Sequence, residues 1–550
     1  MLKTLSSLAL LVAAGAALAG AQEDPPAQSR FRRANGTLVV KSTAGSIPWS
    51  GEPLVRSTEP GERYHYLWAP ELLASARAAA YVDADLPQGF RLGSNVGPPG
   101  SPMVAKAPAR LIDFDGLNRS TAGRLGASFF PPDTIVAASP TKVLEGTNVA
   151  LRLTTRTGFE VDSIPLNNFF GFAGSVLFDP KVYFDRLSER FFVVALEQSL
   201  DPDLSGIWLG VSKSSDPAVL LAPDEFCTYR IQGRREGSWA DYPGIGINEN
   251  WFAVAVNNFA FADGSFRRVQ IYLTRVSQVT DNAESCPALA IKRFAPPTDA
   301  QGRTAFSVHP AQHYTTTDLP GKPLFMVSGS SFLPESYYTL WRIITDAGGQ
   351  PRISKQTIEG DFSYFFPPLA PQRDGALLDT GDTRITQVAF RDGTVWAAHA
   401  TACGIGPLPN ESCVRAVGIT PSADSAAFTF GEAFGRPNMF MFWPGIAVNK
   451  NGDLMMAFQR AVPQGFMGVT FNGKRANALH FDGIRNLRGS SCPLDNFSVN
   501  LGANRTGDYV GLQTDPLDDV SFWVAGEYTS QIDPLMGCDW KTRIGRARYN

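Results

Sequence analysis

The stretch Arg505–Tyr528, RTGDYVGLQTDPLDDVSFWVAGEY, places an acid and an aromatic residue before a short alternating strand, then an acidic turn and an aromatic strand. Asn, Asp and Gly fill the turns of such units, as tight hairpins require. Each unit therefore predicts a pair of antiparallel strands. The same order recurs in DPKVYFDRLSERFFVVAL from Asp179, YPGIGINENWFAVAV from Tyr242, DTRITQVAFRDGTVWAAH from Asp382 and WPGIAVNKNGDLMMAF from Trp443.

Two weaker copies, from Pro131 and Phe306, complete a set of seven units. Their starting points lie near 131, 179, 241, 309, 381, 443 and 507. Separations of roughly 50 to 70 residues leave room for four strands each, which is typical of propellers. We predict an all-β, seven-bladed β-propeller over residues 126–550, with an array of β-sandwiches as the alternative. Alternation places Gly244 and Ile245 on opposite faces, and we expect the glycine face toward the crowded central channel.

Several of these motifs together resemble a group of secreted, largely uncharacterised bacterial β-propeller proteins related in shape to the sialidase superfamily. They are PPDTIVAASP, DPKVYFD with RFFVVAL, DYPGIGINENW, LDTGDTRITQVAFRDGTVWAAH, WPGIAVNKNGD, and GDYVGLQTDP with FWVAGEY. The similarity covers roughly residues 111–550 and implies the propeller fold. It implies no particular reaction, since the S-x-D-x-G-x-T-W box of sialidase hairpins is not found in this sequence.

The N-terminus predicts export. Residues 1–21 carry one Lys, an apolar run and small residues placed for cleavage, as in a secretory signal peptide, and an uncleaved anchor is the alternative. No later segment approaches a transmembrane length. Residues 22–125 carry no copy of the unit and form an N-terminal extension, with a strand expected at 36–41 and a helix at 70–81. We expect a secreted protein, extracellular or periplasmic.

Charge and cysteine usage fit this location. The chain has 49 Lys and Arg against 52 Asp and Glu, without a basic run, which argues against a nucleic-acid partner. Export makes disulfides the expected state of the six cysteines, although six allow fifteen pairings. Metal binding is the alternative, but no CxxC spacing occurs. Proximity favours Cys227 with Cys286, Cys403 with Cys413, and Cys492 with Cys538.

Five units place an acid at or just before their first strand, and these acids are the candidate ligand-binding residues. They are Asp133, Asp179, Asp241, Asp382 and Asp508. If the first strands line the channel, the acids gather near one mouth, where their oxygens could bind sugar hydroxyls or a Ca²⁺ ion. The structural alternative is that each acid accepts hydrogen bonds from its own turn or from the neighbouring blade.

Three further residues are catalytic candidates. His309 takes the place of the acid in its unit, with His313 and Tyr314 nearby, so it could act as a base in eliminative polysaccharide cleavage. Arg384 could hold a substrate carboxylate, or pair with an acid of the fold. Tyr242 begins its unit beside Asp241. His399, in an apolar strand, is expected to be a core residue.

Taken together, the sequence predicts a secreted propeller that binds an extracellular ligand, a glycan or another extracellular partner, at an acid-rich channel mouth. A polysaccharide-active hydrolase or lyase and a structural cell-surface protein are the alternatives. No G-x-S-x-G, P-loop, G-x-G-x-x-G or H-E-x-x-H motif is present to indicate another chemistry.

Overall fold

The computed structural model describes residues 32–33, 37–40 and 107–549, except 126–128, 175, 199–204, 222–223, 234–236, 297, 330–334, 374, 404–410, 499–501 and 534–536. Strands dominate these residues. Their helices are the short α3 (Arg119–Arg124), α4 (Leu166–Phe170) and α5 (Val276–Thr280), so the predicted all-β class is confirmed. The described part holds no helix long and apolar enough to cross a membrane. The signal peptide and the helix expected at 70–81 lie outside it.

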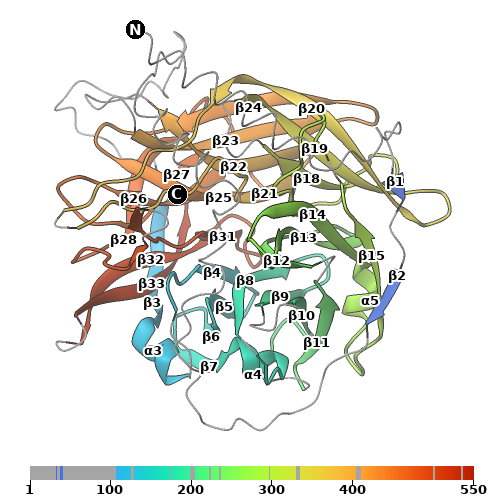
Figure 1. Cartoon of the computed structure of the whole chain (residues 1–550), viewed down its shortest axis with the longest axis horizontal. Coiled ribbons are helices and arrows are strands. Elements are labelled where there is room, and N and C mark those ends of the chain that lie inside the picture. The colour runs from blue at the N-terminus through green and yellow to red at the C-terminus, as the bar shows by residue number, and fades with distance from the viewer. Residues whose placement is uncertain are drawn as a thin grey trace.

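Antiparallel sheets follow one another around a common centre in sequence order (Figure 1). Three of them have four consecutive strands each, with the first strand nearest the centre. The first sheet is β4 (Ile135–Ala138), β5 (Lys142–Thr147), β6 (Ala150–Thr155) and β7 (Glu160–Pro165). The second is β8 (Leu177–Asp185), β9 (Arg190–Gln198), β10 (Ser205–Ser212) and β11 (Phe226–Gln232), and the third is β25 (Phe440–Val448), β26 (Leu454–Ala461), β27 (Gly468–Lys474) and β28 (Asp482–Gly489). The chain is therefore an all-β propeller.

Two larger sheets lie between these. A five-stranded sheet contains β16 (His309–Pro310), β18 (Leu324–Ser328), β19 (Glu335–Thr345), β20 (Pro351–Tyr364) and β1 (Arg32–Arg33). A ten-stranded sheet contains β2 (Thr37–Val40), β12 (Ser238–Ile247), β13 (Trp251–Ala260), β14 (Phe266–Arg275), β15 (Leu289–Phe294), β17 (Gln312–His313), β21 (Gln387–Arg391), β22 (Thr394–Cys403), β23 (Glu411–Pro421) and β24 (Ala426–Phe434). Strand β2 confirms the strand expected at 36–41.

The count of separate blades differs from the expected seven. Five sheets of the described residues have four or five strands, and the sixth has ten. The physical reason is β17, whose two residues pair in parallel with β12 on one side and with β21 on the other. This bridge joins β12–β15, which have β2 at their outer edge, to β21–β24 in one sheet.

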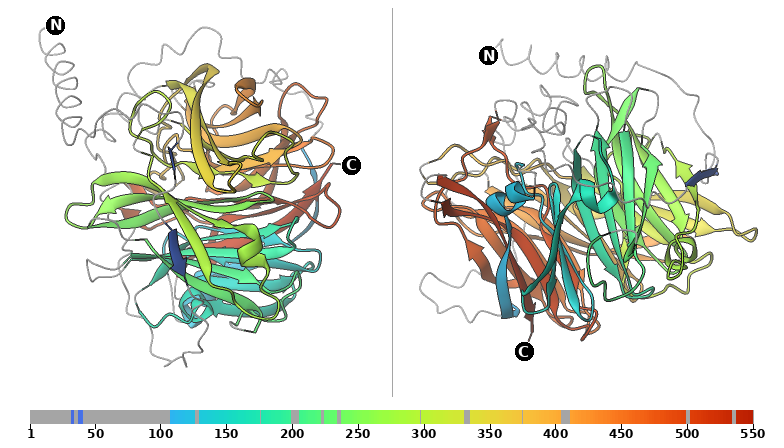
Figure 2. Two further views of the ribbon diagram at one scale, coloured as in Figure 1. Left: turned by 90° about the vertical axis from the view of Figure 1, so that its right-hand side faces the viewer. Right: turned by 90° about the horizontal axis from the view of Figure 1, so that it is seen from below.

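The last sheet closes the ring with an early strand. β31 (Gly511–Thr514), β32 (Phe522–Asp533) and β33 (Gly537–Arg548) are completed by β3 (Ala109–Asn118), which pairs antiparallel with β33. In the side view the blue β3 lies beside the red strands (Figure 2). β3 comes before the boundary that the sequence placed after residue 125, so the propeller takes its closing strand from the N-terminal segment. A two-stranded sheet, β29 (Phe497–Ser498) with β30 (Ala503–Asn504), precedes β31.

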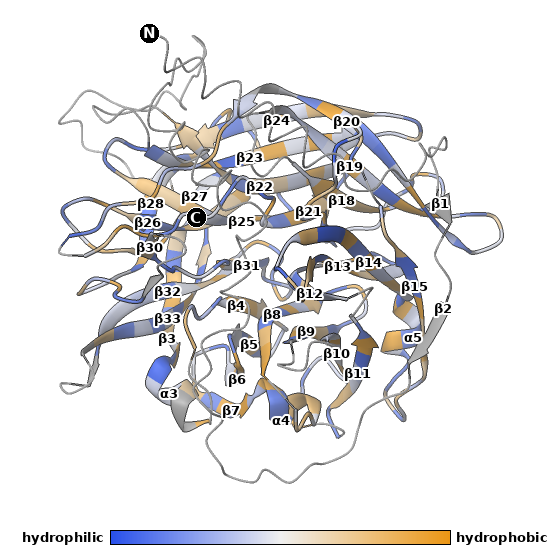
Figure 3. Ribbon diagram, viewed as in Figure 1, coloured by the Kyte–Doolittle hydropathy of each residue, from blue (hydrophilic) through white to orange (hydrophobic). Residues whose placement is uncertain are grey.

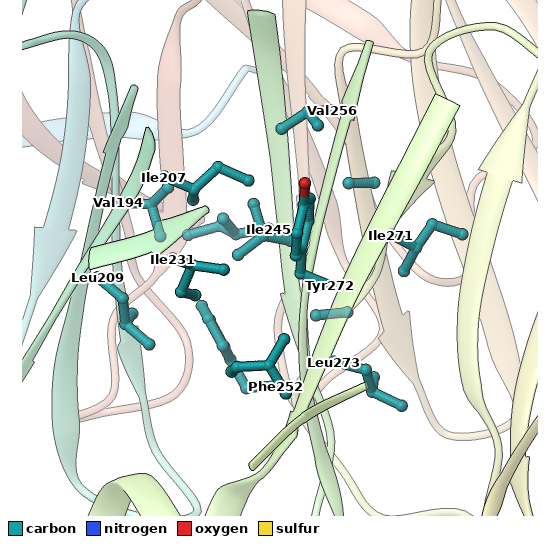
Figure 4. Close-up of a cluster of buried hydrophobic side chains, with 14 of the residues drawn as sticks. Val194, Ile207, Leu209, Ile231, Ile245, Phe252, Val256, Ile271, Tyr272 and Leu273 are labelled. Carbon is teal, nitrogen blue, oxygen red and sulfur yellow. The ribbon is translucent and has the colours of Figure 1, made fainter. Parts of the chain in front are cut away.

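The core lies between neighbouring sheets, because side chains from facing strands interdigitate there. Val194, Ile207, Ile231, Ile245 and Phe252 meet in one buried cluster that joins the β8–β11 sheet to β12–β14 (Figure 4). Hydrophobic residues are spread over the strands of successive sheets in the same way (Figure 3). Burial between sheets, and not within one blade, therefore holds the ring together.

The three expected disulfides are confirmed. Cys227 pairs with Cys286, Cys403 with Cys413 and Cys492 with Cys538, at Cα–Cα distances of 5.4, 6.0 and 6.2 Å. The second pair joins the adjoining ends of β22 and β23, where Cys403 faces Glu411 and Cys413 faces Thr401 in the ladder.

One expectation about the inner strands was wrong. Gly244 packs against the next sheet, where an added Cβ would lie 3.0 Å from Pro310 Cδ, and at Gly246 it would lie 2.5 Å from the carbonyl oxygen of Ala311. Ile245, on the opposite face, lines the central cavity. The glycines are thus required by close contact between adjacent inner strands and not by crowding in the channel itself.

A repeated bulge marks where several inner strands begin. Asp179, Tyr242 and Trp443 have left-handed backbones, with φ of 50°, 51° and 51°, and each precedes a proline. The ladder shifts register at the same points, between Phe178 and Lys181 in β8 and at the matching places in β12 and β25. Proline cannot donate to a ladder, so it is tolerated in an inner strand where a bulge already interrupts the pairing.

The acidic turn of the opening motif fastens four sheets at the opposite end of these strands. Asp519 accepts hydrogen bonds from Arg391 Nη1 at 2.8 Å and lies 2.5 Å from Arg186 Nη1. Asp515 pairs with Arg156, and Lys450 donates its backbone N–H to the Asp519 carbonyl at 3.0 Å. The turn DPLDD therefore acts as a clasp between the last sheet and those that contain β6, β8, β21 and β25.

Replacing Asp519 by Asn should destabilise the whole propeller, because two arginines lose a shared carboxylate. We expect the free energy of unfolding to fall by roughly 1–3 kcal/mol, which lies between the values for exposed and for buried ion pairs. Urea denaturation followed by tryptophan fluorescence measures it. The matched control is Asp263→Asn, whose side chain is 60% exposed and lies 3.9 Å from Arg267. Equal midpoints for the two variants would contradict the role of the clasp.

Candidate functional site

The five candidate acids are all buried near the starts of inner strands. Asp133, Asp179, Asp241, Asp382 and Asp508 are between 0% and 5% exposed. Solvent therefore contributes little to their stabilisation, and each carboxylate depends on donors from the protein.

Asp133 and Asp508 connect the first sheet to the last. Asp133 accepts the backbone N–H of Asp508 with one oxygen at 2.7 Å and the side-chain amide of Asn148 with the other at 2.7 Å. The Asp508 carboxylate accepts Arg505 Nη2 at 2.9 Å, and Arg505 Nη1 lies 3.6 Å from Asp379. These contacts match the structural alternative, in which an acid serves a neighbouring blade.

Asp179 joins the second sheet to its neighbour. It accepts the backbone N–H of Tyr242 at 3.3 Å, with the Tyr509 hydroxyl 3.5 Å away. Its own N–H donates to the amide oxygen of Asn148 at 2.8 Å. Asp241 lies beside Tyr242 at the bulge of β12, opposite Asn257 of β13. The bulges leave backbone donors outside the ladder, and the acid and amide side chains accept them.

Arg384 pairs within its own unit. Its Nε and Nη2 donate to Asp382 at 2.9 and 2.6 Å, and its backbone N–H donates to the same carboxylate at 2.7 Å. The guanidinium lies 4.3 Å from the centroid of the Tyr242 ring. Arg384 is 1% exposed, so it supports Tyr242 from behind and does not face the cavity.

Lys181 lies among these groups, and the sequence analysis did not select it. Its Nζ is 2.8 Å from the centroid of the Tyr509 ring and 5.8 Å from that of Tyr242. Burial lowers the pKa of this amine to about 7, and the charges of Asp179, Asp133 and Asp508 only partly offset that effect. No hydrogen bond to Nζ is found among the described residues. Three of the five candidate acids therefore surround one poorly solvated amine.

A signal for Lys181 was present in the repeats. In four units with a left-handed residue near the start of the inner strand, the residue two positions later differs. It is Gly244 or Gly445 in two of these units, and Lys181 or His309 in the other two. The matching positions thus carry a glycine in two units and a polar side chain in two others. Alignment of the units on their bulges would have shown this difference.

His309 lines the same cavity. Its Nδ1 lies 3.0 Å from the carbonyl oxygen of Pro310, and no described residue bonds to Nε2. Burial, together with the nearby Lys181, lowers the pKa of His309 to about 3. The imidazole is therefore neutral at physiological pH and a weak base, which disfavours the proton abstraction that the sequence had assigned to it.

The other histidines of this region belong to the core. His313 stacks between Phe325 and Phe390, at centroid distances of 5.7 and 4.4 Å. His399 is core, as expected, since its nitrogens lie 2.9 Å from the Tyr338 hydroxyl and 2.8 Å from the carbonyl oxygen of Ala400.

The central cavity is small. Its polar lining consists of Lys181, His309, Gln312, Thr386 and Gln387, with Tyr509 and aliphatic side chains between them. It has room for about one or two water-sized groups, so a sugar ring does not fit inside it. Of the catalytic candidates only His309 reaches this cavity. Tyr242 and Arg384 stand one layer behind it.

Comparison with known proteins defines no family. No family model matches the chain, and no curated protein matches it. Solved structures that are similar include a protein of unknown function from Dyadobacter fermentans (11% identity, 80% of this chain, 100% of that one, TM-score 0.33). A mutant NanB sialidase from Streptococcus pneumoniae is 7% identical over 68% of this chain and 68% of that one, with a TM-score of 0.35. An α-L-arabinanase from Penicillium chrysogenum is 9% identical over 79% of this chain and 98% of that one, with a TM-score of 0.32. Similarities at these levels show nothing about a shared ligand or reaction.

A calcium site stays a prediction that can be tested by chelation. The described residues contain no group of three or more His, Cys, Asp or Glu side chains placed to hold a metal ion. Arg384, Arg505 and Lys181 already offset the acids. We therefore expect the melting temperature to be the same in EDTA and in added Ca²⁺. A rise with Ca²⁺ that is lost in Asp508→Asn would instead establish a metal site.

Glu527 predicts a pH dependence of stability. It accepts the N–H of Gly507 at 3.1 Å, and burial raises its pKa from the ordinary 4.5 to about 8. The native state thus keeps a proton that the unfolded chain has released, and this contribution is lost as pH rises through about 8. Glu527→Gln should therefore gain roughly 1–3 kcal/mol over the wild type between pH 6 and pH 9. Urea denaturation at the two pH values measures the difference, and parallel changes in both proteins would contradict it.

Proposed function

We propose that the protein binds an extracellular glycan at the mouth of the propeller channel next to Lys181. The observation that carries this proposal is that Lys181, His309 and Tyr509 line the cavity from three sheets, with Tyr242 one layer behind them. The Tyr242 and Tyr509 rings lie 5.4 Å apart. Aromatic faces beside hydrogen-bonding groups are a suitable environment for a sugar, and Lys181 Nζ and His309 Nε2 are a donor and an acceptor for a hydroxyl.

The size of the cavity limits how such a ligand would bind. Because only a water-sized group fits inside, the sugar would insert one hydroxyl or hydroxymethyl group and leave its ring outside. The candidate acids would act indirectly, by holding the donors of the bulges and the charge of Lys181 in place.

The same proposal includes a seven-bladed ring. If β17 is a bridge and not a blade strand, then β12–β15 and β21–β24 are two blades, and the chain has seven successive runs of four strands. Left-handed residues near the starts of inner strands support this count because they occur once in each of five of the seven runs, at Asp133, Asp179, Tyr242, Ser307 and Trp443.

We also propose export to the cell exterior or periplasm, after removal of the signal peptide at residues 1–21. Three disulfides with every described cysteine paired support an oxidising compartment. N-terminal sequencing of the protein from culture medium or periplasm would test the processing site.

A polysaccharide lyase is the second candidate, and Lys181 is the observation that favours it. An amine with a pKa of about 7 is a better general base near neutral pH than His309. Assays for new reducing ends and for unsaturated uronate absorbance distinguish this enzyme from a binding protein. A structural cell-surface protein would give neither binding nor products.

Lys181→Met should abolish most of the glycan binding while it leaves the fold intact. Methionine keeps the bulk of the side chain against Tyr509 but loses the donor, so we expect affinity to fall at least about tenfold, the equivalent of one charged hydrogen bond. A glycan array identifies the ligand, and calorimetry measures the affinity. Lys322→Met, at a lysine whose side chain is 56% exposed, is the matched control. Equal affinities for the two variants would place the binding site elsewhere.

A further inference from the structure

Lys181 differs from a lysine that serves only as a counter-ion. Its side chain is buried, with 5% exposure of the residue, yet its Nζ makes no hydrogen bond or close ion pair with the described residues. Asp508 and Asp382 are held by Arg505 and Arg384, and Asp133 and Asp179 by backbone and amide donors. The acids nearest to Lys181 are therefore satisfied without it.

The amine also borders free space. Lys181 lines the central cavity together with His309, and the cavity has room for a water-sized group. A carbonyl group is of that size. The Tyr509 ring covers the amine on one side, at 2.8 Å from Nζ to its centroid, which leaves the cavity as the open direction.

We propose that Lys181 is a reactive amine that forms an imine with small aldehydes admitted to the channel. In this step the lone pair of Nζ attacks the carbonyl carbon, and the oxygen takes a proton to give a carbinolamine. The carbinolamine then loses its hydroxyl group and the remaining nitrogen proton as water, which leaves a carbon–nitrogen double bond. One aldehyde is consumed and one water is released, without an oxidant or reductant.

The surroundings favour this chemistry at neutral pH. Burial holds the pKa of Lys181 at about 7, so the amine has a free lone pair when a solvated lysine, which titrates near ~10.4, is almost wholly protonated. His309 Nε2 is an acceptor in the same cavity and can receive a hydrogen bond from the carbinolamine hydroxyl. The inference does not rest on glycan binding, since an aldehyde of two carbons is sufficient.

The test is reductive trapping on the wild-type chain, so no variant needs to fold. The protein is incubated with glycolaldehyde and cyanoborohydride at pH 7.5, and peptide mapping follows hydroxyethyl groups on Lys181 and on the exposed Lys322 in the same sample. By the cited pKa values the neutral fraction at Lys181 is several hundred times larger than that of a solvated lysine, so even a weaker nucleophile should be labelled about ten times faster than Lys322.

Two features identify the site. The rate at Lys181 should level off above about pH 8, and its advantage over Lys322 should vanish in urea. Labelling of Lys181 that is no faster than that of Lys322, or that rises in parallel with it, would overturn the proposal. Glycan binding is measured separately by calorimetry, so failure of one proposal is distinguishable from failure of the other.

Discussion

The bulges at the starts of the inner strands impose the constraint on which the rest of the structure depends. A bulge removes backbone N–H groups from the ladder in a region that water barely reaches, and each such group must find an acceptor. Asp179 accepts the N–H of Tyr242 and Asn148 accepts that of Asp179, and Asp133 accepts the N–H of Asp508 just before β31 in the same way. Because donor and acceptor belong to different sheets in these pairs, satisfying the bulges also sets the position of one sheet relative to the next.

The use of buried carboxylates as acceptors requires that their negative charges be offset. Carboxylates are strong acceptors but costly to bury, and the chain offsets them with guanidinium groups in bidentate or nearly bidentate contact. Arg384 binds Asp382, and Arg505 binds Asp508 and lies beside Asp379, so neither guanidinium has much left to offer a ligand. Lys181, which lies at the cavity, has no such contact with a described residue. Lys181 is thus a residue at the central cavity that the hydrogen bonds and ion pairs between the sheets do not use.

Much of the fold could be predicted from period and turn chemistry. Alternating residues and Asn, Asp or Gly turns predicted the hairpins, and short separations predicted the three disulfides. Three features were missed because they depend on contacts between distant segments. β3 reaches the last sheet across the whole chain, β17 bridges two strand runs, and Ile245 faces the cavity because Gly244 must contact Pro310. The acids were recognised by their recurrence, whereas Lys181 was missed because it occurs in one unit alone.

The opening motif is explained by the contacts at both of its ends. At its start, Asp508 is tied to the first sheet through Asp133 and to its own unit through Arg505. Along its strand, the Gln513 amide donates to the carbonyl of Phe184 at 2.7 Å. At its turn, Asp519 holds arginines from two other sheets. Because the sheets close into a ring, the last inner strand must match several neighbours at once. That requirement accounts for an acid before the strand, polar residues within it and acids after it.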